Sequence, residues 1–192
     1  MIRSGTEGTH SFRGRDLPEF EPRLPRSNVI LEALPREEQA RLSVDLDLVT
    51  LNRAETLRAP GETVTHVYFP ISGVLSLVTE MASGEGVEVA NVGREGIIGL
   101  EVMFGVGKAS TRSIVQVPGE ALAMRTHSFL KYLGQCPELQ NLVCRYAGAL
   151  FALVAQSAGC NRIHPVGERL ARWLLMTQDR AGTAELPLTQ EV

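Results

Sequence analysis

THVYFPISGVLSLV, residues 65–78, contains two short runs of mostly apolar, β-branched and aromatic residues at 65–69 and 74–78. The turn-forming residues 70–73 lie between the two runs. Apolar runs on either side of a proline- and glycine-bearing turn are typical of neighbouring antiparallel strands. The stretch therefore predicts a strand, a tight connection and a second strand.

The same alternation of short β-rich runs and turns extends from residue 46 to residue 125. Further turns are expected at residues 59–61, 83–86, 93–96 and 118–120. Strands at intervals of roughly 8–12 residues, without a long helix between them, favour an antiparallel sandwich, roll or barrel over a parallel sheet. We therefore predict a mainly β fold with α-helices, built around an antiparallel β-roll.

Helices are expected on both sides of this roll. Ser27 or Asn28 can cap a short helix that reaches Ala33, and Pro35 suits the first turn of another. After the roll, helical periodicity predicts a long helix over residues 137–158, ended by Gly159. Pro165 is expected to begin a further helix that opens a separate small unit, with an apolar face formed by Leu170, Trp173, Leu174 and Thr177.

The long helix is apolar on two sides. One stripe contains Leu139, Leu142, Tyr146, Ala149 and Leu153, and the other contains Val143, Ala147, Leu150 and Val154. One stripe is enough to pack against the roll, so the second needs another partner. A symmetry-related copy is the economical choice, and we predict a homodimer through Leu139, Leu142, Tyr146, Ala149 and Leu153. The alternative is a helix buried inside a monomer.

Composition limits the class of protein. The chain has 192 residues and a formal net charge of −3, which gives no overall attraction to nucleic acid. Residues 1–26 lack the apolar core of a secretory signal and are expected to form a disordered tail. Charges and glycines interrupt every candidate membrane span, so we expect a cytoplasmic protein with no membrane contact. The three cysteines, Cys136, Cys144 and Cys160, lack metal-type spacing and are expected to be reduced core thiols.

Four segments, in this order of elements, resemble the CRP/FNR family of bacterial transcription regulators. They are residues 61–73, 93–100, 115–121 and 169–175, and with the topology they cover about residues 28–192. The resemblance implies a cyclic nucleotide-binding-like jelly roll, with a sensor domain at 27–136, a dimerisation helix at 137–160 and the start of a winged helix-turn-helix at 161–192. Thr189 would open the first helix of that DNA-binding motif. The recognition helix would follow Val192, so this chain is expected to be truncated and to contact DNA only through a missing segment.

The resemblance also implies where an effector would bind. Family members that bind cyclic AMP use a Gly-Glu pair and an Arg-Ser pair around the cyclic phosphate, and the corresponding residues here are Gly99, Leu100, Glu101, Thr111, Arg112 and Ser113. Leu100 stands where the glutamate is expected, and alignment of the following strand puts Thr111 at the position of the phosphate-binding arginine. Because alternate strand residues face opposite sides, Arg112 could point away from the pocket. We therefore expect an unknown small effector, or a vestigial cavity, instead of cyclic AMP.

Neither catalysis nor a cofactor is expected. Residues 1–135 contain no cysteine for an iron–sulfur cluster, and His66 is the only histidine in the β region, too few for a cupin-type metal site. Ser157, His164 and Asp179 lack the context of a catalytic triad. Arg162, Arg169, Arg172 and Arg180 form a modest basic stretch that would touch DNA phosphates or merely solvate a helix.

The sequence thus predicts the sensor and dimerisation part of a CRP/FNR-type DNA-binding regulator. A stand-alone cyclic nucleotide-binding-type sensor or interaction module is the alternative. The effector, the target promoters and the sign of regulation are left open.

Overall fold

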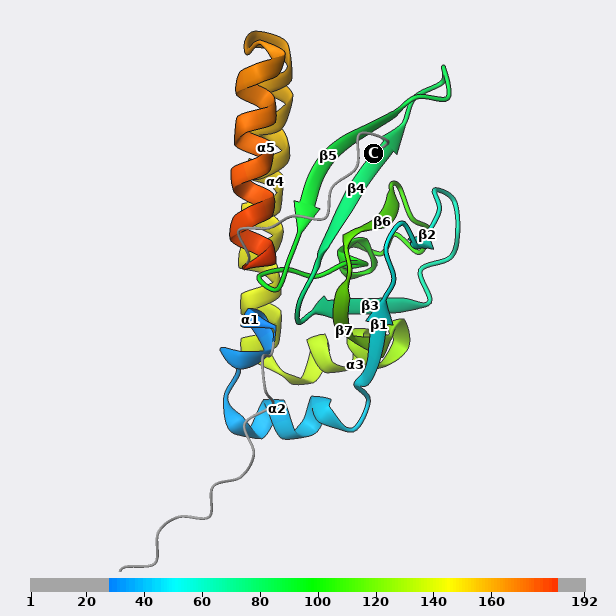
Figure 1. Cartoon of the computed structure of the whole chain (residues 1–192). Coiled ribbons are helices and arrows are strands. Elements are labelled where there is room, and N and C mark those ends of the chain that lie inside the picture. Colours follow the sequence, from blue (N-terminus) through cyan, green and yellow to red (C-terminus); the bar gives the residue numbers. More distant parts are fainter. Residues whose placement is uncertain (1–27, 183–192) are drawn as a thin grey trace, which may run out of the picture.

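The computed structural model describes residues 28–182 (Figure 1). Antiparallel strands form a three-stranded sheet of order β1-β7-β3 and a four-stranded sheet of order β2-β6-β4-β5. The strands are β1 (Asp47–Leu51), β2 (Thr56–Arg58), β3 (His66–Pro70), β4 (Val74–Glu80), β5 (Gly86–Val92), β6 (Arg112–Val117) and β7 (Gly119–Arg125). The predicted antiparallel roll is confirmed, and β3 and β4 are the two strands expected from residues 65–78.

Two short helices precede the roll, a 3-10 helix lies between β5 and β6, and three longer helices follow the roll. They are α1 (Val29–Glu32), α2 (Arg36–Ser43), the 3-10 helix η1 (Leu100–Phe104), α3 (Thr126–Gln135), α4 (Pro137–Ile163) and α5 (Val166–Ala181). The Asn28 side chain caps α1 by accepting a bond from the Ile30 amide, as expected, and its own amide donates to Pro70 O at 3.1 Å and Gly96 O at 2.8 Å. One buried residue therefore caps the first helix and ties it to the roll.

The end of α4 differs from the prediction. The helix continues through Gly159 to Ile163, and His164 is extended with ψ of 142°. The ring of Pro165 disfavours a helical conformation in the residue before it, so the proline ends the helix and the glycine does not.

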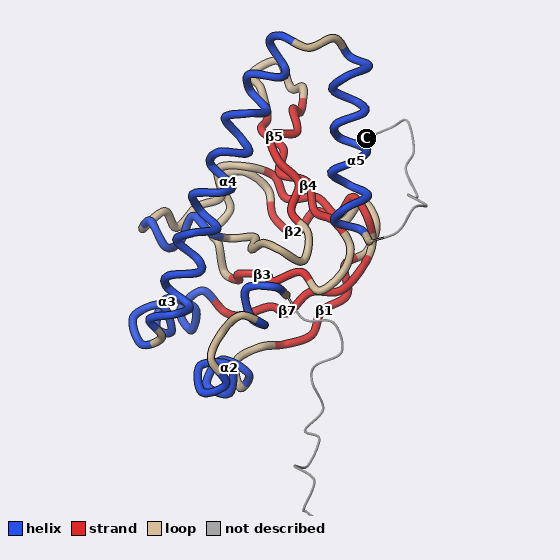
Figure 2. The backbone as a smooth tube through the Cα atoms, turned by 90° about the vertical axis from the view of Figure 1, so that its left-hand side faces the viewer, coloured by secondary structure: helices blue, strands red, loops and turns tan. Residues whose placement is uncertain are grey.

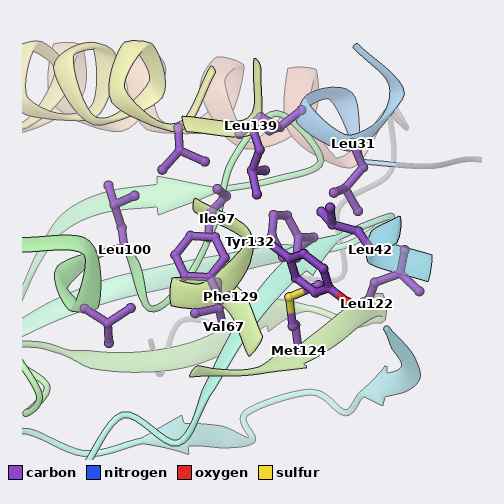
Figure 3. Close-up of a cluster of buried hydrophobic side chains, with 14 of the residues drawn as sticks. Leu31, Leu42, Val67, Ile97, Leu100, Leu122, Met124, Phe129, Tyr132 and Leu139 are labelled. Atoms are coloured by element: carbon purple, nitrogen blue, oxygen red, sulfur yellow. The ribbon is translucent and has the colours of Figure 1, made fainter. Parts of the chain in front are cut away.

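The main hydrophobic core lies where α1 to α4 meet the three-stranded sheet (Figure 3). Val67 and Met124 from the sheet contact Phe129 and Tyr132 of α3 and Leu139 of α4. A second, smaller cluster fills the space between the sheets around Leu75, Val92 and Val115. The first part of α4 is therefore an integral part of the sensor core.

The second part of α4 runs alongside β5, and α5 returns from the turn at Pro165 with the two helices diverging (Figure 2). Within residues 165–182, α5 packs against β4 and hydrogen-bonds to β5. That Pro165 opens a separate unit stays a prediction. By length and composition alone α4 could cross a membrane, and 6% of its most apolar window is buried in the single chain. One such helix is weak evidence for a membrane span. The predicted tail at 1–26 and the predicted N-cap Thr189 lie outside the described residues.

Candidate effector site

The connection after β5 brings the expected effector residues to the edge of the roll. Gly99 adopts the left-handed conformation, with φ of 97°, and leads directly into η1. A Cβ atom at this position would lie 3.0 Å from His66 O, so the close approach to β3 requires glycine. Leu100 then turns inward and belongs to the main hydrophobic core.

Glu101 forms a buried ion pair with Arg58 of β2. Arg58 Nη2 lies 2.8 Å from Glu101 Oε1, and their side chains are only 8% and 18% exposed. Ser113 of β6 is paired in register with Arg58 and is fully buried. Arg58 Nε, Arg58 Nη1 and Ser113 Oγ have no hydrogen-bond partner among the described residues. We call Arg58, Glu101 and Ser113 the cassette cluster.

Arg112 lies outside the cassette cluster. Its guanidinium pairs with Glu80 on the neighbouring strand β4. The side chains of Arg112 and Glu80 are 35% and 40% exposed. Arg112 and Ser113 follow one another in β6, so their side chains point to opposite faces of the sheet. Thr111 precedes the strand and is partly buried. The structure thus brings Glu101 and Ser113 together, and adds Arg58, but separates them from Arg112.

Arg58 was not predicted as a site residue from the sequence. Arginine before a turn is ordinary, and only the pairing of β2 with β6 brings it to Ser113, 55 positions later in the sequence. Nothing in the local pattern of residues 56–58 distinguishes it from a surface charge.

A second polar network fastens α5 to the four-stranded sheet. Trp173 Nε1 donates to Glu88 Oε1 at 2.9 Å, and Ser76 Oγ donates to Glu88 Oε2 at 2.7 Å. Burial raises the pKa of the Glu88 carboxyl above its ordinary value, although the bonds from Ser76 and Trp173 oppose this. Arg180 Nε donates to Glu95 Oε1 at 2.7 Å further along the helix. Glu88 and its partners were not singled out from the sequence, because they belong to elements far apart in the chain.

The predicted dimer residues divide between the core and the surface. Leu139 is 0% exposed and cannot reach a second copy, and Tyr146 is half-buried and packs against both core clusters. Leu142 and Leu153 are half-buried, and Leu142 packs on the core. Only Ala149 is exposed. The roll needs the large side chains of this stripe, which corrects the expectation that the whole stripe is available to a partner.

A different row of α4 faces solvent in the single chain. Its members are exposed and recur at alternate steps of four and three residues: Cys144, Gly148, Phe151, Ala155 and Ala158. Phe151 is 76% exposed. We call this row the heptad row. The heptad row includes Cys144, which is exposed. The expectation that all three cysteines are core thiols is therefore wrong for Cys144.

The remaining chemical candidates are dispersed. Ser157 Oγ donates to Leu153 O and accepts from Arg172, whereas His164 Nδ1 lies 2.6 Å from Glu168 Oε2. Across residues 28–182, no three histidine, cysteine, aspartate or glutamate side chains group as metal ligands would.

Residues 48–136 match the family described as "Cyclic nucleotide-binding domain". The N-terminal domain of a transcriptional regulator from Streptomyces coelicolor A3(2) is 24% identical, with a TM-score of 0.51 over 66% of this chain and 91% of that chain. The c-di-GMP responsive global regulator CLP of Xanthomonas campestris is 14% identical, with a TM-score of 0.65 over 80% and 77%. A regulatory subunit of a cAMP-independent protein kinase A from Trypanosoma cruzi, bound to guanosine, is 17% identical, with a TM-score of 0.55 over 63% and 42%.

A search of curated proteins gives no match. The three structures named above are each below 25% identical to this chain, so their likeness establishes the fold alone. Residues 48–136 therefore form a cyclic nucleotide-binding-like domain, and the structures that resemble the chain include transcriptional regulators.

Proposed function

We propose that this chain is the sensor and dimerisation part of a CRP/FNR-type transcription regulator whose effector is not cyclic AMP. The fold and the likeness to CLP support the regulator class. DNA contact would come from a helix-turn-helix beginning near Thr189, outside the described residues. The β-roll would detect the signal, and α4 would carry it between two copies.

The observation that carries the effector part of the proposal is the Arg58–Glu101 ion pair. Glu101 already neutralises the only arginine in the cassette cluster, and Arg112 is held by Glu80 on the other face of β6. A cyclic phosphate would thus meet no uncompensated cation there, and a buried anion without a cation is strongly disfavoured. Leu100 lies in the hydrophobic core and cannot accept a hydrogen bond from a ribose hydroxyl.

Titration calorimetry with cyclic AMP tests this point. An unpaired buried hydroxyl costs about 1–3 kcal/mol, and each ~1.4 kcal/mol is tenfold in affinity, so together with the missing cation we expect millimolar binding or weaker. Arg112→Ala should leave the isotherm unchanged. A micromolar isotherm that Arg112→Ala abolishes would contradict the proposal.

The heptad row supports dimerisation by a second copy of α4. Apolar residues repeating every 3.5 positions form the seam of a two-stranded coiled coil, and the small Gly148, Ala155 and Ala158 would let two helices approach closely. The exposed Phe151 would be covered in such a dimer. The seam lies opposite the face that packs on the roll, so the pairing leaves the core intact.

Replacing Phe151 and Ala155 together by glutamate should convert dimers to monomers in analytical ultracentrifugation. Four carboxylates would then meet along one seam, where charges are strongly disfavoured. Ala40→Glu, an exposed alanine of the separate helix α2, is the matched control and should remain dimeric. A parent chain that sediments as a monomer at all accessible concentrations would refute the dimer.

The alternative function is a stand-alone sensor or interaction module without DNA binding. Trp173 and Arg180 attach α5 to the sensor domain by hydrogen bonds, and this attachment favours the stand-alone module. A helix that packs on the sensor domain can end there without leading into another domain. Whether the reading frame continues beyond Val192 into a helix-turn-helix distinguishes the two functions.

A further inference from the structure

A crevice is lined by residues of α4, α5 and β5. Figure 2 shows the backbone of β5 between those of the two helices. Its cavity volume is about 160 Å³, below the ~300–1,000 Å³ of pockets for drug-sized ligands. The part of an occupant that the crevice encloses is therefore small. The lining residues are Glu88, Val89, Ala90, Asn91, Ser157, Cys160, Asn161, Arg169, Arg172, Trp173 and Met176.

Two arginines of α5 give the crevice a positive wall. Arg172 Nη1 donates to Ser157 Oγ at 3.3 Å across the crevice, and Ser157 is itself neutral. Arg169 is half-buried, its Nε has no hydrogen-bond partner, and no carboxylate among residues 28–182 pairs with it. Guanidinium groups that are partly desolvated and lack a carboxylate are suited to bind an oxyanion.

A buried acceptor without a partner belongs to a residue at the floor of the crevice. Asn91 is 2% exposed and donates to Thr177 Oγ1 at 3.3 Å, while its Oδ1 has no partner. Val89, Cys160 and Met176 make much of the remaining lining apolar. The site thus combines cations on one wall, a buried acceptor below and an apolar surface between them.

We propose that this crevice binds a small organic carboxylate, with Arg169 and Arg172 on the carboxylate group and the apolar lining on the carbon body. The inference goes beyond the proposed function, which leaves this crevice unassigned, and it does not depend on what the β-roll detects. A ligand here would contact both β5 and α5. It would therefore stabilise α5 in the position seen, because a ligand shifts a conformational equilibrium towards the state that it binds better.

Glu88 does not exclude such an anion. Its two carboxylate oxygens accept hydrogen bonds from Trp173, Ser76 and, at 3.4 Å, Gln116. These donors partly offset the negative charge of Glu88 that an anion in the crevice would meet. Arg169 and Arg172 supply two positive charges against this single carboxylate.

The chain contains one tryptophan, and Trp173 lines the crevice, so its fluorescence emission reports on this site alone. We would titrate the whole chain with benzoate, with benzyl alcohol as a neutral analogue and with inorganic phosphate as an anion without a carbon body. Benzoate should change the emission saturably and slow hydrogen exchange in α5, and the other two compounds should bind at least about tenfold more weakly. No saturable change with benzoate would overturn the proposal, as would equal binding of benzyl alcohol or of phosphate.

Variants separate this site from nonspecific binding. Arg169→Gln removes an unpaired charge and should fold normally, yet weaken benzoate binding by about tenfold or more, as a lost charge-assisted bond predicts. Arg172→Gln provides a second test, and Arg36→Gln on the distant helix α2 is the matched control with unchanged affinity. Equal benzoate affinity in the parent, Arg169→Gln and Arg172→Gln would overturn the proposal, even if the β-roll proved to bind another effector.

Discussion

Arg58 in the β-roll and Arg169 in the crevice are both withdrawn from solvent, but their surroundings differ. Arg58 faces Glu101 at 2.8 Å inside the cassette cluster, whereas Arg169 has no carboxylate partner among the described residues. A buried arginine whose charge is matched mainly holds structure, and one whose charge is unmatched is prepared for an external anion. At the position where relatives of this fold would hold a nucleotide, the arginine charge is thus matched by Glu101, although Arg58 Nε, Arg58 Nη1 and Ser113 Oγ lack hydrogen-bond partners. The arginine without a carboxylate partner lies on α5 instead.

Breaking the Arg58–Glu101 pair should give the largest effect on stability. Glu101→Gln leaves the Arg58 guanidinium buried without a carboxylate, which typically costs about 3–5 kcal/mol, and urea unfolding would measure the loss. Glu80→Gln, which breaks the exposed pair with Arg112, is the matched control and should cost less than about 1 kcal/mol.

The double variant Arg58→Leu with Glu101→Leu sharpens this test. Removal of both charges leaves nothing unpaired, so its stability should approach or exceed that of the parent chain. If Glu101→Gln lowers the free energy of unfolding by no more than Glu80→Gln does, the cassette cluster is more solvated than its burial indicates. The contrast with Arg169 then fails.

Loosening α5 should have an intermediate effect. Trp173→Phe removes the bond to Glu88 Oε1 but retains an aromatic ring, and the loss of a bond to a charged acceptor costs about 1–3 kcal/mol. Hydrogen exchange should then accelerate in α5 and remain unchanged in β1, β3 and β7. Leu175→Ala, on the exposed face of the same helix, should leave both regions unchanged. Uniform acceleration throughout the chain would mean that α5 is not a separately opening element.

The same contrast explains what the sequence could predict. Turn residues and short apolar runs are local signals, so the roll, its flanking helices and the cap at Asn28 were all predictable. The cassette cluster and the crevice depend on pairings such as Arg58 with Ser113 and Trp173 with Glu88, which only the tertiary structure defines. Glu101 and Ser113 were found because the family resemblance pointed to them, and their new partner Arg58 was not.

Helix α4 shows a second limit of prediction from the sequence. Both of the predicted stripes are apolar, and periodicity alone cannot assign one to the core. The structure places the large Leu139 and Tyr146 inward and exposes a row rich in small residues. Side-chain volume could have indicated this division, because a roll with a deep core needs bulk, whereas two helices in close contact need small side chains.

The smallest expected effect concerns the pH dependence contributed by Glu88. Its pKa in the folded chain is raised above the ordinary value of 4.5, with burial as the main cause. The contribution of Glu88 to stability is therefore complete below the unfolded-state pKa and is lost as the pH rises through the raised folded-state pKa.

Glu88→Gln cannot ionise and still offers an oxygen to Trp173, so it should lack this loss. Urea unfolding over a pH series starting below 4.5 should show the variant gaining on the parent as the pH rises, by less than about 1 kcal/mol. Ser76→Ala removes a hydrogen bond that lowers the pKa of Glu88 and should make the loss larger, with its midpoint at higher pH. Parallel stability curves for the parent and both variants would show that Glu88 is as well solvated in the folded chain as in the unfolded one, and the network that holds α5 would then be open to water.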